Sequence, residues 1–233
     1  MKKVLLYSGG MDSWLIDKLW EPDIKLYVNM HTEYSNWEIA RLPKDVDVVD
    51  LPIGQYSLNN SIIPLRNLYL FLVACNVTYF EDAEICLGAL DGDRINDKSQ
   101  EFVDLLNPLL KYLYEEQFSQ PGRNVKAVMP YKKYSKRELL EMYIEKGGDI
   151  DEVWYNTFSC YHPKQGKMCL DCKACFRKAI PFIVAGREFT DDEKSKLKSY
   201  VNRVVIPNIN DYTQDKGKEG IDCKKALEII GEW

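Results

Sequence analysis

The sequence has no long hydrophobic run, and this absence excludes a class of protein. No apolar stretch approaches the roughly 20 residues that a membrane-spanning helix requires. The apolar segment that follows the first lysines is short and runs into Gly9 and Gly10, which is unlike a signal peptide. We therefore expect a cytoplasmic protein with no membrane partner.

The sequence also has no excess of basic residues. The 36 Asp and Glu residues outnumber the 31 Lys and Arg residues, which makes the formal net charge -5. Nucleic-acid-binding domains usually carry a basic patch or stripe on one face. Because the chain contains no basic tract, we expect small-molecule substrates and no nucleic-acid partner.

The seven cysteines, an odd number, do not suit a disulfide framework in a reducing compartment. Four of them, Cys160, Cys169, Cys172 and Cys175, follow the pattern C-x8-C-x2-C-x2-C. Closely spaced thiolates can surround one tetrahedral ion, so we predict a structural Zn²⁺ site with no open position. An iron–sulfur cluster is the alternative. His162 is a further candidate ligand, although a single loop histidine is more often a bystander.

Strand-like and helix-like segments alternate over the first two-thirds of the chain. Strands are predicted at residues 4–7, 24–28, 47–51, 84–90 and 125–129, and helices at residues 11–20, 36–42, 65–80, 100–117 and 135–146. This alternation implies βαβ units, and hence an α/β fold with a mostly parallel five-stranded sheet flanked by helices. Ligands of such sheets bind outside the carboxyl ends of the strands.

The sequence changes character near residue 156. A cysteine-dense loop covers residues 160–175, and a polar helix is predicted at residues 190–200. A charged linker is predicted at residues 214–220, before a last helix at residues 222–230. We therefore predict an α/β domain at residues 1–155 and a zinc-binding segment with a helical extension at residues 156–233.

A glycine-rich loop, Ser8-Gly9-Gly10-Met11-Asp12-Ser13, lies between the first predicted strand and the first predicted helix. Glycines allow a tight turn and a close approach of the backbone to an anion, and the helix that follows presents its first amides to the loop. Asp12 would repel phosphate alone, but it suits Mg²⁺ carried with the phosphates. Glycine and serine by themselves are equally typical of a plain strand-to-helix turn.

The complete loop resembles the S-G-G-x-D-S pyrophosphate loop of the N-type ATP pyrophosphatases, and it is not a Walker A motif. The resemblance implies an adenine nucleotide alpha-hydrolase-like fold for residues 1–155, with ATP and Mg²⁺ as ligands. In that family the loop holds the β- and γ-phosphates while an acceptor oxygen attacks the α-phosphate. The nucleotide-binding residues that it implies around the loop are Tyr7, Ser8, Gly9, Gly10, Met11, Asp12, Ser13, Trp14 and Leu15.

Two further segments carry candidate site residues. Arg66 and Asn67 open the long helix after the third strand, where a guanidinium can reach a phosphate. Lys136 lies in the first turn of the helix after the fifth strand and can extend toward the nucleotide. The alternative for Arg66 is a surface arginine at an ordinary helix start, and Lys136 taken alone is more often a solvated lysine. We assign catalytic roles to Asp12, Ser13, Arg66 and Lys136, and nucleotide binding also to Arg66 and Asn67.

The loop and the cysteine cluster together resemble those of the 7-cyano-7-deazaguanine synthases over most of residues 1–180. Segments similar to motifs of that family are Glu33-Tyr34 with Glu38-Ile39, Ile63-Pro64-Leu65-Arg66-Asn67, and Thr157–Tyr161 with the three later cysteines. The resemblance implies conversion of 7-carboxy-7-deazaguanine to the nitrile, preQ0, through an amide, in queuosine-type biosynthesis. It implies two ATP-dependent adenylations, with ammonia as the nitrogen donor. Because the chain shows no glutaminase domain, we expect free ammonia.

The resemblance is weaker at the acceptor end. Residues 88–102 lack the tyrosine-proline-aspartate-cysteine-arginine run of the family and offer Asp91, Asp93 and Arg94 instead. The alternatives are therefore a reaction that stops at the amide, another acceptor, a tRNA-modifying relative, or a non-catalytic nucleotide-binding protein. The tail from Arg187 has no assigned role. A homodimer is a candidate assembly that the sequence neither requires nor excludes.

Overall fold

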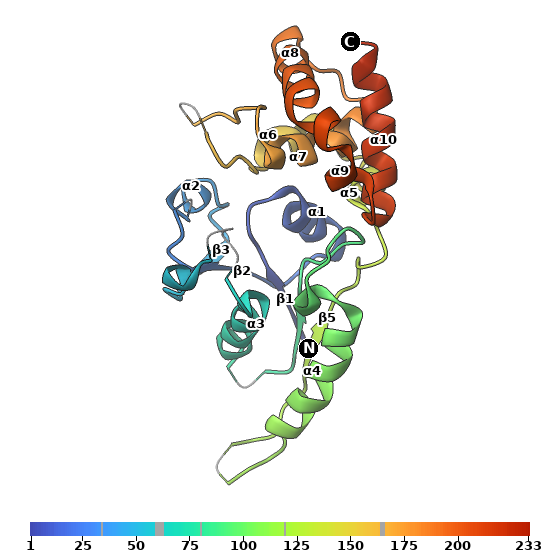
Figure 1. The fold of residues 1–233 in the computed structure, drawn as a ribbon. Helices are drawn as coiled ribbons and strands as arrows, with labels where there is room; N and C mark the ends of the chain where they lie inside the picture. Colours follow the sequence, from blue (N-terminus) through green and yellow to red (C-terminus); the bar gives the residue numbers. More distant parts are fainter. Residues whose placement is uncertain (34, 59–62, 80, 119, 164–165) are drawn as a thin grey trace. The chain divides into compact units, whose positions relative to one another are not determined.

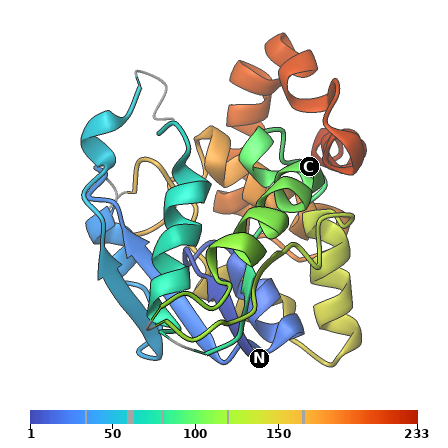
Figure 2. The ribbon, with the colours of Figure 1, turned by 90° about the horizontal axis from the view of Figure 1, so that it is seen from below.

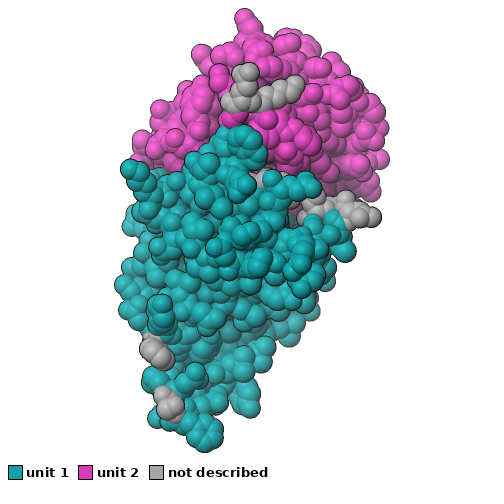
Figure 3. All heavy atoms as spheres, turned by 90° about the vertical axis from the view of Figure 1, so that its left-hand side faces the viewer, with its two compact units in different colours: residues 1–9, 16–89, 93–132 teal, residues 10–15, 90–92, 133–233 magenta. Residues whose placement is uncertain are grey.

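The structure, a computed structural model, describes residues 1–33, 35–58, 63–79, 81–118, 120–163 and 166–233 (Figures 1 and 2). Tyr34 and Phe80, to which the sequence interpretation refers, lie outside the described residues. The chain divides into two compact units, which Figure 3 distinguishes by colour. Unit 1 comprises residues 1–9, 16–89 and 93–132, and unit 2 comprises residues 10–15, 90–92 and 133–233.

Unit 1 is built on a five-stranded sheet. Its strands are β1 (Lys2–Leu6), β2 (Ile24–Asn29), β3 (Val46–Asp50), β4 (Ala83–Cys86) and β5 (Val125–Val128). They lie in the order β3-β2-β1-β4-β5, and every neighbouring pair is parallel. This confirms the predicted α/β fold with a parallel sheet. β4 ends at Cys86 rather than at Leu90, although the Leu87 amide still donates to the Val128 carbonyl oxygen over 3.1 Å.

Apolar side chains explain which strands occupy the centre of the sheet. Val4 of β1 lies opposite Ile85 of β4, and neither side chain is exposed to solvent. Strands that are covered on both faces need such uninterrupted apolar runs. β3, at the edge, is mostly exposed, and it accordingly carries Asp47 and Asp50.

Helices complete the core of unit 1. The helices that lie wholly within its described part are α2 (Ser35–Ile39), α3 (Arg66–Val77), α4 (Gln100–Leu113), η1 (Gly54–Tyr56) and η2 (Asn96–Lys98). α3 packs on β1, β2 and β4, while α4 packs on β5 (Figures 1 and 2). Phe71 of α3 and Leu106 of α4 belong to the same buried cluster as the strand side chains. α1 (Met11–Trp20), whose bounds match the prediction, runs from unit 2 into unit 1.

The direction in which the chain fills the sheet reverses between β1 and β4. From β1 the chain proceeds outward to β2 and β3, and then returns to place β4 on the other side of β1. In parallel sheets, ligands bind outside the carboxyl ends of the strands at such a switch point. The segments that leave these two ends are residues 7–9 after β1 and residues 87–89 after β4. They mark the edge at which unit 1 can receive a ligand.

Unit 2 is helical. Its described helices and helical turns are α5 (Lys136–Glu145), α6 (Ile150–Asn156), α7 (Lys173–Val184), α8 (Asp191–Tyr200), η3 (Val201–Val205), η4 (Ile206–Asn208), α9 (Ile209–Thr213) and α10 (Gly217–Gly231). Trp154 of α6 is buried between Phe182 and Phe189, with ring centroids 4.9 and 5.3 Å away. The predicted capping box of α5 is confirmed, because Ser135 and Glu138 each accept a hydrogen bond from the other's backbone amide.

The predicted linker at residues 214–220 is wrong, because α10 already begins at Gly217. A glycine at a helix start has low helix propensity, so the local sequence favours a linker there. A distant residue changes the balance: the Asp91 carboxylate accepts a hydrogen bond from the Lys218 amide over 2.7 Å. This contact satisfies one amide of the first turn, a group that has no acceptor inside the helix.

The predicted domain boundary between residues 155 and 156 stays a prediction. The contact-based division groups α5 and α6 with the helices that follow them, and α5 packs on α7. No helix in the described part of the chain is long and apolar enough to cross a membrane.

Arg187 is a buried charge in unit 2. Its guanidinium donates to the Asp151 carboxylate over 2.7 Å and to the Glu193 carboxylate over 3.3 Å. The same group lies 4.5 Å from the centre of the Trp154 ring, and only 3% of the side chain is exposed. Arg187 therefore joins α6 to α8 by charge and by packing.

We predict that Arg187→Ala lowers the free energy of unfolding by about 3 kcal/mol, because two carboxylates lose a partner and a cavity opens over Trp154. Lys196→Ala, which removes an exposed ion pair with Asp192, is the control and should change it by less than about 0.5 kcal/mol. Chemical denaturation followed by far-UV circular dichroism measures both. Equal losses in the two variants would contradict the structural role of Arg187.

Candidate functional site

The glycine-rich loop starts at the carboxyl end of β1, in unit 1. The Tyr7 amide donates to the Leu26 carbonyl oxygen over 2.8 Å, which extends the strand pairing by one residue. Gly9 then adopts φ = 71°, a left-handed conformation that residues with a Cβ adopt only at an energetic cost. The Tyr7 side chain is buried, so any contribution of Tyr7 to nucleotide binding comes from its backbone.

The rest of the loop forms the first turn of α1, in unit 2. The Trp14 amide donates to the Gly10 carbonyl oxygen over 3.0 Å, and the buried Ser13 hydroxyl donates to the same oxygen over 3.1 Å. The first amides of a helix have no acceptor within it and carry partial positive charge, so this turn suits an anion. The side chains of Met11, Trp14 and Leu15 are buried, so they pack in the core rather than face a ligand.

Asp12 and Lys136 are in contact although 124 residues separate them in the sequence. The Lys136 ammonium donates to both carboxylate oxygens of Asp12. About a quarter of each side chain is exposed, at 28% for Asp12 and 21% for Lys136, so a ligand can reach the pair. The structure thus joins two of the residues that the sequence predicts to be catalytic, a pairing that no local spacing indicates.

Asp222, in α10, holds the residues on both sides of Lys136. Its carboxylate accepts a hydrogen bond from the Ser135 hydroxyl over 3.0 Å and another from Arg137 Nε over 2.7 Å. The Asp222 side chain is only 4% exposed, so its charge is stabilised by these two hydrogen bonds rather than by water. The sequence assigns the C-terminal tail no role, and no motif around Asp222 reveals this one. α10 therefore helps to position the first turn of α5, which carries Lys136.

Arg66 and Asn67 stand in the first turn of α3, in unit 1. The helix begins after Leu65, which has a left-handed φ of 58° and provides no side-chain cap. A cap comes instead from Asp97, whose carboxylate accepts from the Asn67 amide over 3.1 Å and from Asn67 Nδ2 over 2.9 Å. Arg66 and Asn67 belong to unit 1, whereas Asp12 and Lys136 belong to unit 2.

Glu38, in α2, belongs to the segment that resembles an acceptor-side family motif. The Tyr27 hydroxyl donates to its carboxylate over 2.7 Å. Burial raises the pKa of the Glu38 carboxyl, while this hydrogen bond and the positive charge of Arg66 act in the opposite direction. Arg66 is therefore close enough to act electrostatically on a buried acid within unit 1.

The acidic residues of the divergent segment at residues 88–102 have structural partners. Asp91 caps α10 through the Lys218 amide, as described above. Asp93 forms an ion pair with Lys98 over 3.3 Å, and the Lys98 ammonium also donates to the Gly88 carbonyl oxygen over 3.5 Å. Both aspartates thus help to fix the backbone, although the sequence offers them as replacements for the missing family motif.

The four predicted zinc ligands converge in unit 2. The Sγ atoms of Cys160, Cys169, Cys172 and Cys175 all lie within 4.8 Å of one another, and those of Cys169 and Cys175 are 3.9 Å apart. A tetrahedral ion with Zn–S bonds of about 2.3 Å places its sulfurs about 3.8 Å apart, so the cluster is close to the geometry that zinc requires. His162 is not among the described residues that form this cluster.

Local backbone structure brings the cysteines together. Leu170 takes a left-handed φ of 55° between the second and third ligands, and Cys172 is the residue that precedes α7. The amide of Asp171 donates to Cys169 Sγ over 3.4 Å, and the Cys169 amide donates to Cys160 Sγ over 3.3 Å. Such amide-to-sulfur hydrogen bonds orient the sulfurs and stabilise thiolates, which are the metal-binding form.

The electrostatics of the cluster favour a bound cation. A hydrogen bond from Cys175, together with backbone amides, lowers the pKa of Cys172 to about 4. The same contact raises the pKa of Cys175, and burial raises the pKa of Cys169 to about 11. One thiolate therefore forms readily, while each further thiolate meets repulsion and desolvation. A divalent ion removes that repulsion, and its binding free energy therefore adds to the free energy of folding.

Lys178, one turn after Cys175 in α7, supports this region from within. Its buried ammonium donates to the carbonyl oxygens of Trp154 over 2.7 Å and of Thr157 over 2.6 Å. Burial lowers the pKa of Lys178 to about 7, and the negative charge of Cys175 acts in the opposite direction. These hydrogen bonds connect α7 to the end of α6, from which the chain continues to Cys160. Without knowledge of α6, the sequence does not single out this residue.

Comparison with known protein families gives a match over more than half of the chain. Residues 40–186 match the model of the family described as queuosine biosynthesis protein QueC. The chain belongs to the QueC family. The matched segment contains Arg66, Lys136 and the four clustered cysteines, and it begins after the glycine-rich loop.

Several curated relatives of this QueC-family chain are named 7-cyano-7-deazaguanine synthases. The 7-cyano-7-deazaguanine synthase 1 of Colwellia psychrerythraea is 26% identical over 215 residues, which cover 78% of this chain and 93% of the relative. The 7-cyano-7-deazaguanine synthase of Marinomonas sp. is 26% identical over 220 residues, covering 80% and 95% of the two chains. That of Chlorobaculum tepidum is 25% identical over 224 residues, covering 81% and 94%.

We predict that Cys172→Ser lowers both the zinc content and the thermal stability of the protein, because one of four ligands is lost and metal binding contributes to folding. Cys75→Ala, at a buried cysteine outside the cluster, should keep one zinc per chain. Elemental analysis of the purified variants measures the zinc. A full zinc equivalent in Cys172→Ser would exclude Cys172 as a ligand.

We predict that Asp222→Ala destabilises the protein by about 2 kcal/mol and raises the KM for ATP several-fold, because Ser135 and Arg137 lose the group that holds the turn around Lys136. Glu228→Ala changes an exposed residue of the same helix and should leave both quantities unchanged. Denaturation curves and steady-state kinetics provide the measurements. An unchanged KM for ATP, with stability reduced, would limit Asp222 to a structural role.

Proposed function

We propose that the chain is a 7-cyano-7-deazaguanine synthase, an ATP-dependent ligase that converts 7-carboxy-7-deazaguanine and ammonia to the nitrile. Membership of the QueC family and the names of the curated relatives support the assignment. The observation that carries the ATP chemistry is the Asp12–Lys136 pair. It sets a carboxylate and a lysine beside the first amides of α1, a helix start suited to phosphate.

ATP is assigned to the glycine-rich loop, with its β- and γ-phosphates on the backbone amides of residues 8–13. Lys136 is assigned to supply positive charge for the phosphate oxygens, and Arg66 keeps the nucleotide-binding role that the sequence predicts. Mg²⁺, the usual companion of ATP phosphates, neutralises part of their charge when bound. Asp12 offers the carboxylate that such an ion prefers as a ligand. The buried side chains of Met11, Trp14 and Leu15 support the loop from behind rather than touch the nucleotide.

The first half of the reaction makes an amide. A carboxylate oxygen of the acceptor attacks the α-phosphorus, and the bond from that phosphorus to pyrophosphate breaks. Ammonia then attacks the carbon of the acyl adenylate, loses a proton and displaces AMP. Adenylation turns a poor leaving oxygen into a good one, so positioning and charge stabilisation suffice and no protein nucleophile is needed.

The second half makes the nitrile. The amide oxygen attacks the α-phosphorus of a second ATP, and pyrophosphate leaves again. The nitrogen of the resulting imidoyl adenylate loses its two protons as the carbon–oxygen bond to AMP breaks, which leaves a carbon–nitrogen triple bond. Each nitrile therefore accounts for two ATP, two AMP and two pyrophosphate.

The cysteine cluster has a structural role in this proposal. Its four sulfurs fit one Zn²⁺, and four protein ligands leave no position for a substrate. A cytoplasmic location suits these thiolate ligands, because a reducing compartment protects them from oxidation.

A product that stops at the amide is the second candidate, and one observation favours it. The divergent segment after β4 uses Asp91 and Asp93 for internal contacts rather than presenting them to a ligand. On this alternative the acceptor side lacks groups that serve the second adenylation. The number of AMP molecules released per acceptor separates the two outcomes.

We predict two AMP per acceptor and a nitrile product when the protein is incubated with ATP, Mg²⁺, ammonium and 7-carboxy-7-deazaguanine. Mass spectrometry identifies the product, and one AMP with an amide product would support the second candidate.

Asp12→Asn should slow AMP release at least about 100-fold without unfolding the protein. Asp104→Asn, at an exposed site on α4, should react like the wild type. No acceptor-dependent AMP from the wild type would refute the proposed function.

A further inference from the structure

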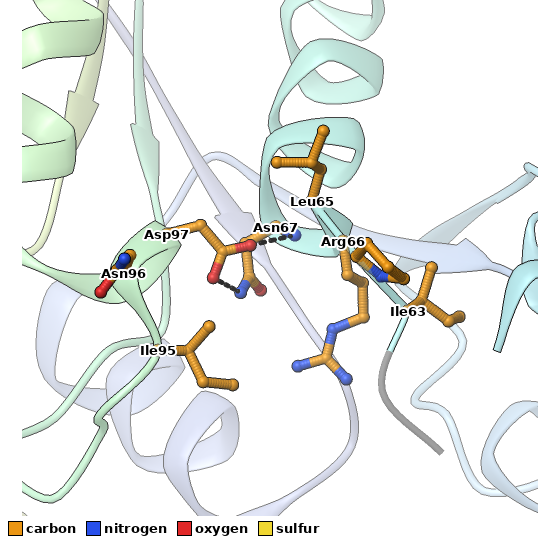
Figure 4. Close-up of a pocket in the computed structure, with 8 residues that line it drawn as sticks. Ile63, Leu65, Arg66, Asn67, Ile95, Asn96 and Asp97 are labelled. Carbon is orange, nitrogen blue, oxygen red and sulfur yellow. Dashed lines mark hydrogen bonds between the residues drawn. The ribbon is translucent and has the colours of Figure 1, made fainter. Parts of the chain in front are cut away.

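Unit 1 contains a cavity of about 230 Å³ (Figure 4). Two segments line it: residues 63–67, which lead into α3, and residues 95–97, which lead into η2. The first follows β3 and the second follows β4 in the chain, and the carboxyl ends of these two parallel strands lie at the same edge of the sheet. This is the edge at which parallel sheets bind their ligands.

One wall of the cavity carries a fixed pair of hydrogen-bond acceptors. The Asp97 carboxylate accepts from both the amide and the Nδ2 of Asn67, so the nitrogen of the Asn67 side chain must face Asp97. The Asn67 side-chain oxygen is left to face elsewhere, and it has no hydrogen-bond donor among the described residues. Asn67 is only 6% exposed, and both residues line the cavity. The carboxylate retains free lone pairs, so Asn67 and Asp97 together present acceptors.

Arg66 contributes a positive charge and hydrogen-bond donors to the same cavity. Figure 4 shows its side chain extending into the space between the two segments, with Ile95 across from it. A guanidinium offers five donors in a planar fork that matches a carboxylate. The apolar side chains of Ile63 and Ile95 also line the cavity. The cavity therefore combines one cation, one set of acceptors and apolar sides.

We propose that this cavity binds the acceptor, a flat heteroaromatic carboxylate with an amino-pyrimidinone edge. The acceptor carboxylate faces Arg66, and its ring N–H and exocyclic amino group donate to Asn67 and Asp97. The assignment rests on the proposed function, and it makes Asn67 and Asp97 specificity residues for the acceptor rather than for ATP.

Adenine is the competing occupant, and its chemistry fits less well. Its pairing edge offers one amino donor beside a ring nitrogen that is an acceptor, and this nitrogen would oppose the oxygens of Asn67 and Asp97. Two adjacent donors, as on the amino-pyrimidinone edge, satisfy both acceptors. A buried acceptor that loses its donor is costly, which is how such a site discriminates.

The test compares 7-carboxy-7-deazaguanine with the analogue in which hydrogen replaces the exocyclic amino group. AMP release by the wild-type protein should show a kcat/KM about 10- to 100-fold lower for the analogue. Asn67→Ala and Asp97→Asn should lower kcat/KM for the natural acceptor and reduce this ratio to about threefold or less. Both should leave the KM for ATP within about twofold of the wild type.

Asp104→Asn is the matched control for the change of charge, and it should keep the wild-type ratio. Circular dichroism and zinc content identify any variant that fails to fold, and the wild-type comparison needs no variant. A wild-type ratio near one would overturn the inference, as would a raised KM for ATP with an unchanged ratio in Asn67→Ala. Acceptor-dependent AMP from the wild type in the same assay would leave the proposed function standing.

Discussion

Parallel pairing of β1 with β4 is the constraint on which the functional reading of unit 1 depends. Because every strand runs in the same direction, all the connections leave from one edge, and the loops after β1, β3 and β4 gather there. The start of the glycine-rich loop, the Arg66–Asn67 turn and the Asp97 segment follow these three strands. Charged and apolar side chains of the protein therefore lie at the same edge of the sheet, although they are far apart in the sequence.

Carboxylates supplied from a distance determine where several helices begin. Asp97 caps α3 through the Asn67 amide, Asp91 caps α10 through the Lys218 amide, and Asp222 binds the cap residue of α5. The first two contacts satisfy an amide at a helix start that has no acceptor within its own helix, and the third holds the hydroxyl of the residue that caps α5. The first and the last contact also fix the backbone beside Arg66 and Lys136, which are predicted site residues. The carboxylates that stabilise these two helix starts therefore also fix the backbone of the predicted site residues.

The cysteine cluster and its surroundings show why a metal site can be stable in a small helical unit. Four buried or partly buried sulfurs repel one another once ionised, and the amides of Asp171 and Cys169 offset only part of that repulsion. A divalent ion supplies the missing charge and ties the loop to α7. Lys178 satisfies carbonyl groups that the same packing buries at the end of α6, and the buried Arg187 pairs with the exposed carboxylate of Asp151. These contacts give the C-terminal segment its own core.

The sequence by itself determined the parallel sheet, the bounds of α1, the cap at Ser135 and the four-cysteine ligand set, because apolar runs, glycines, capping pairs and ligand spacing are local signals. It also identified Asp12 and Lys136 separately. Only the tertiary structure decided that these two touch, that α10 begins at Gly217, and that Asp97 and Asp222 bind to the turns that carry predicted site residues. Each of these contacts joins residues 30 or more positions apart, and no local pattern encodes the partner of a charge that far away.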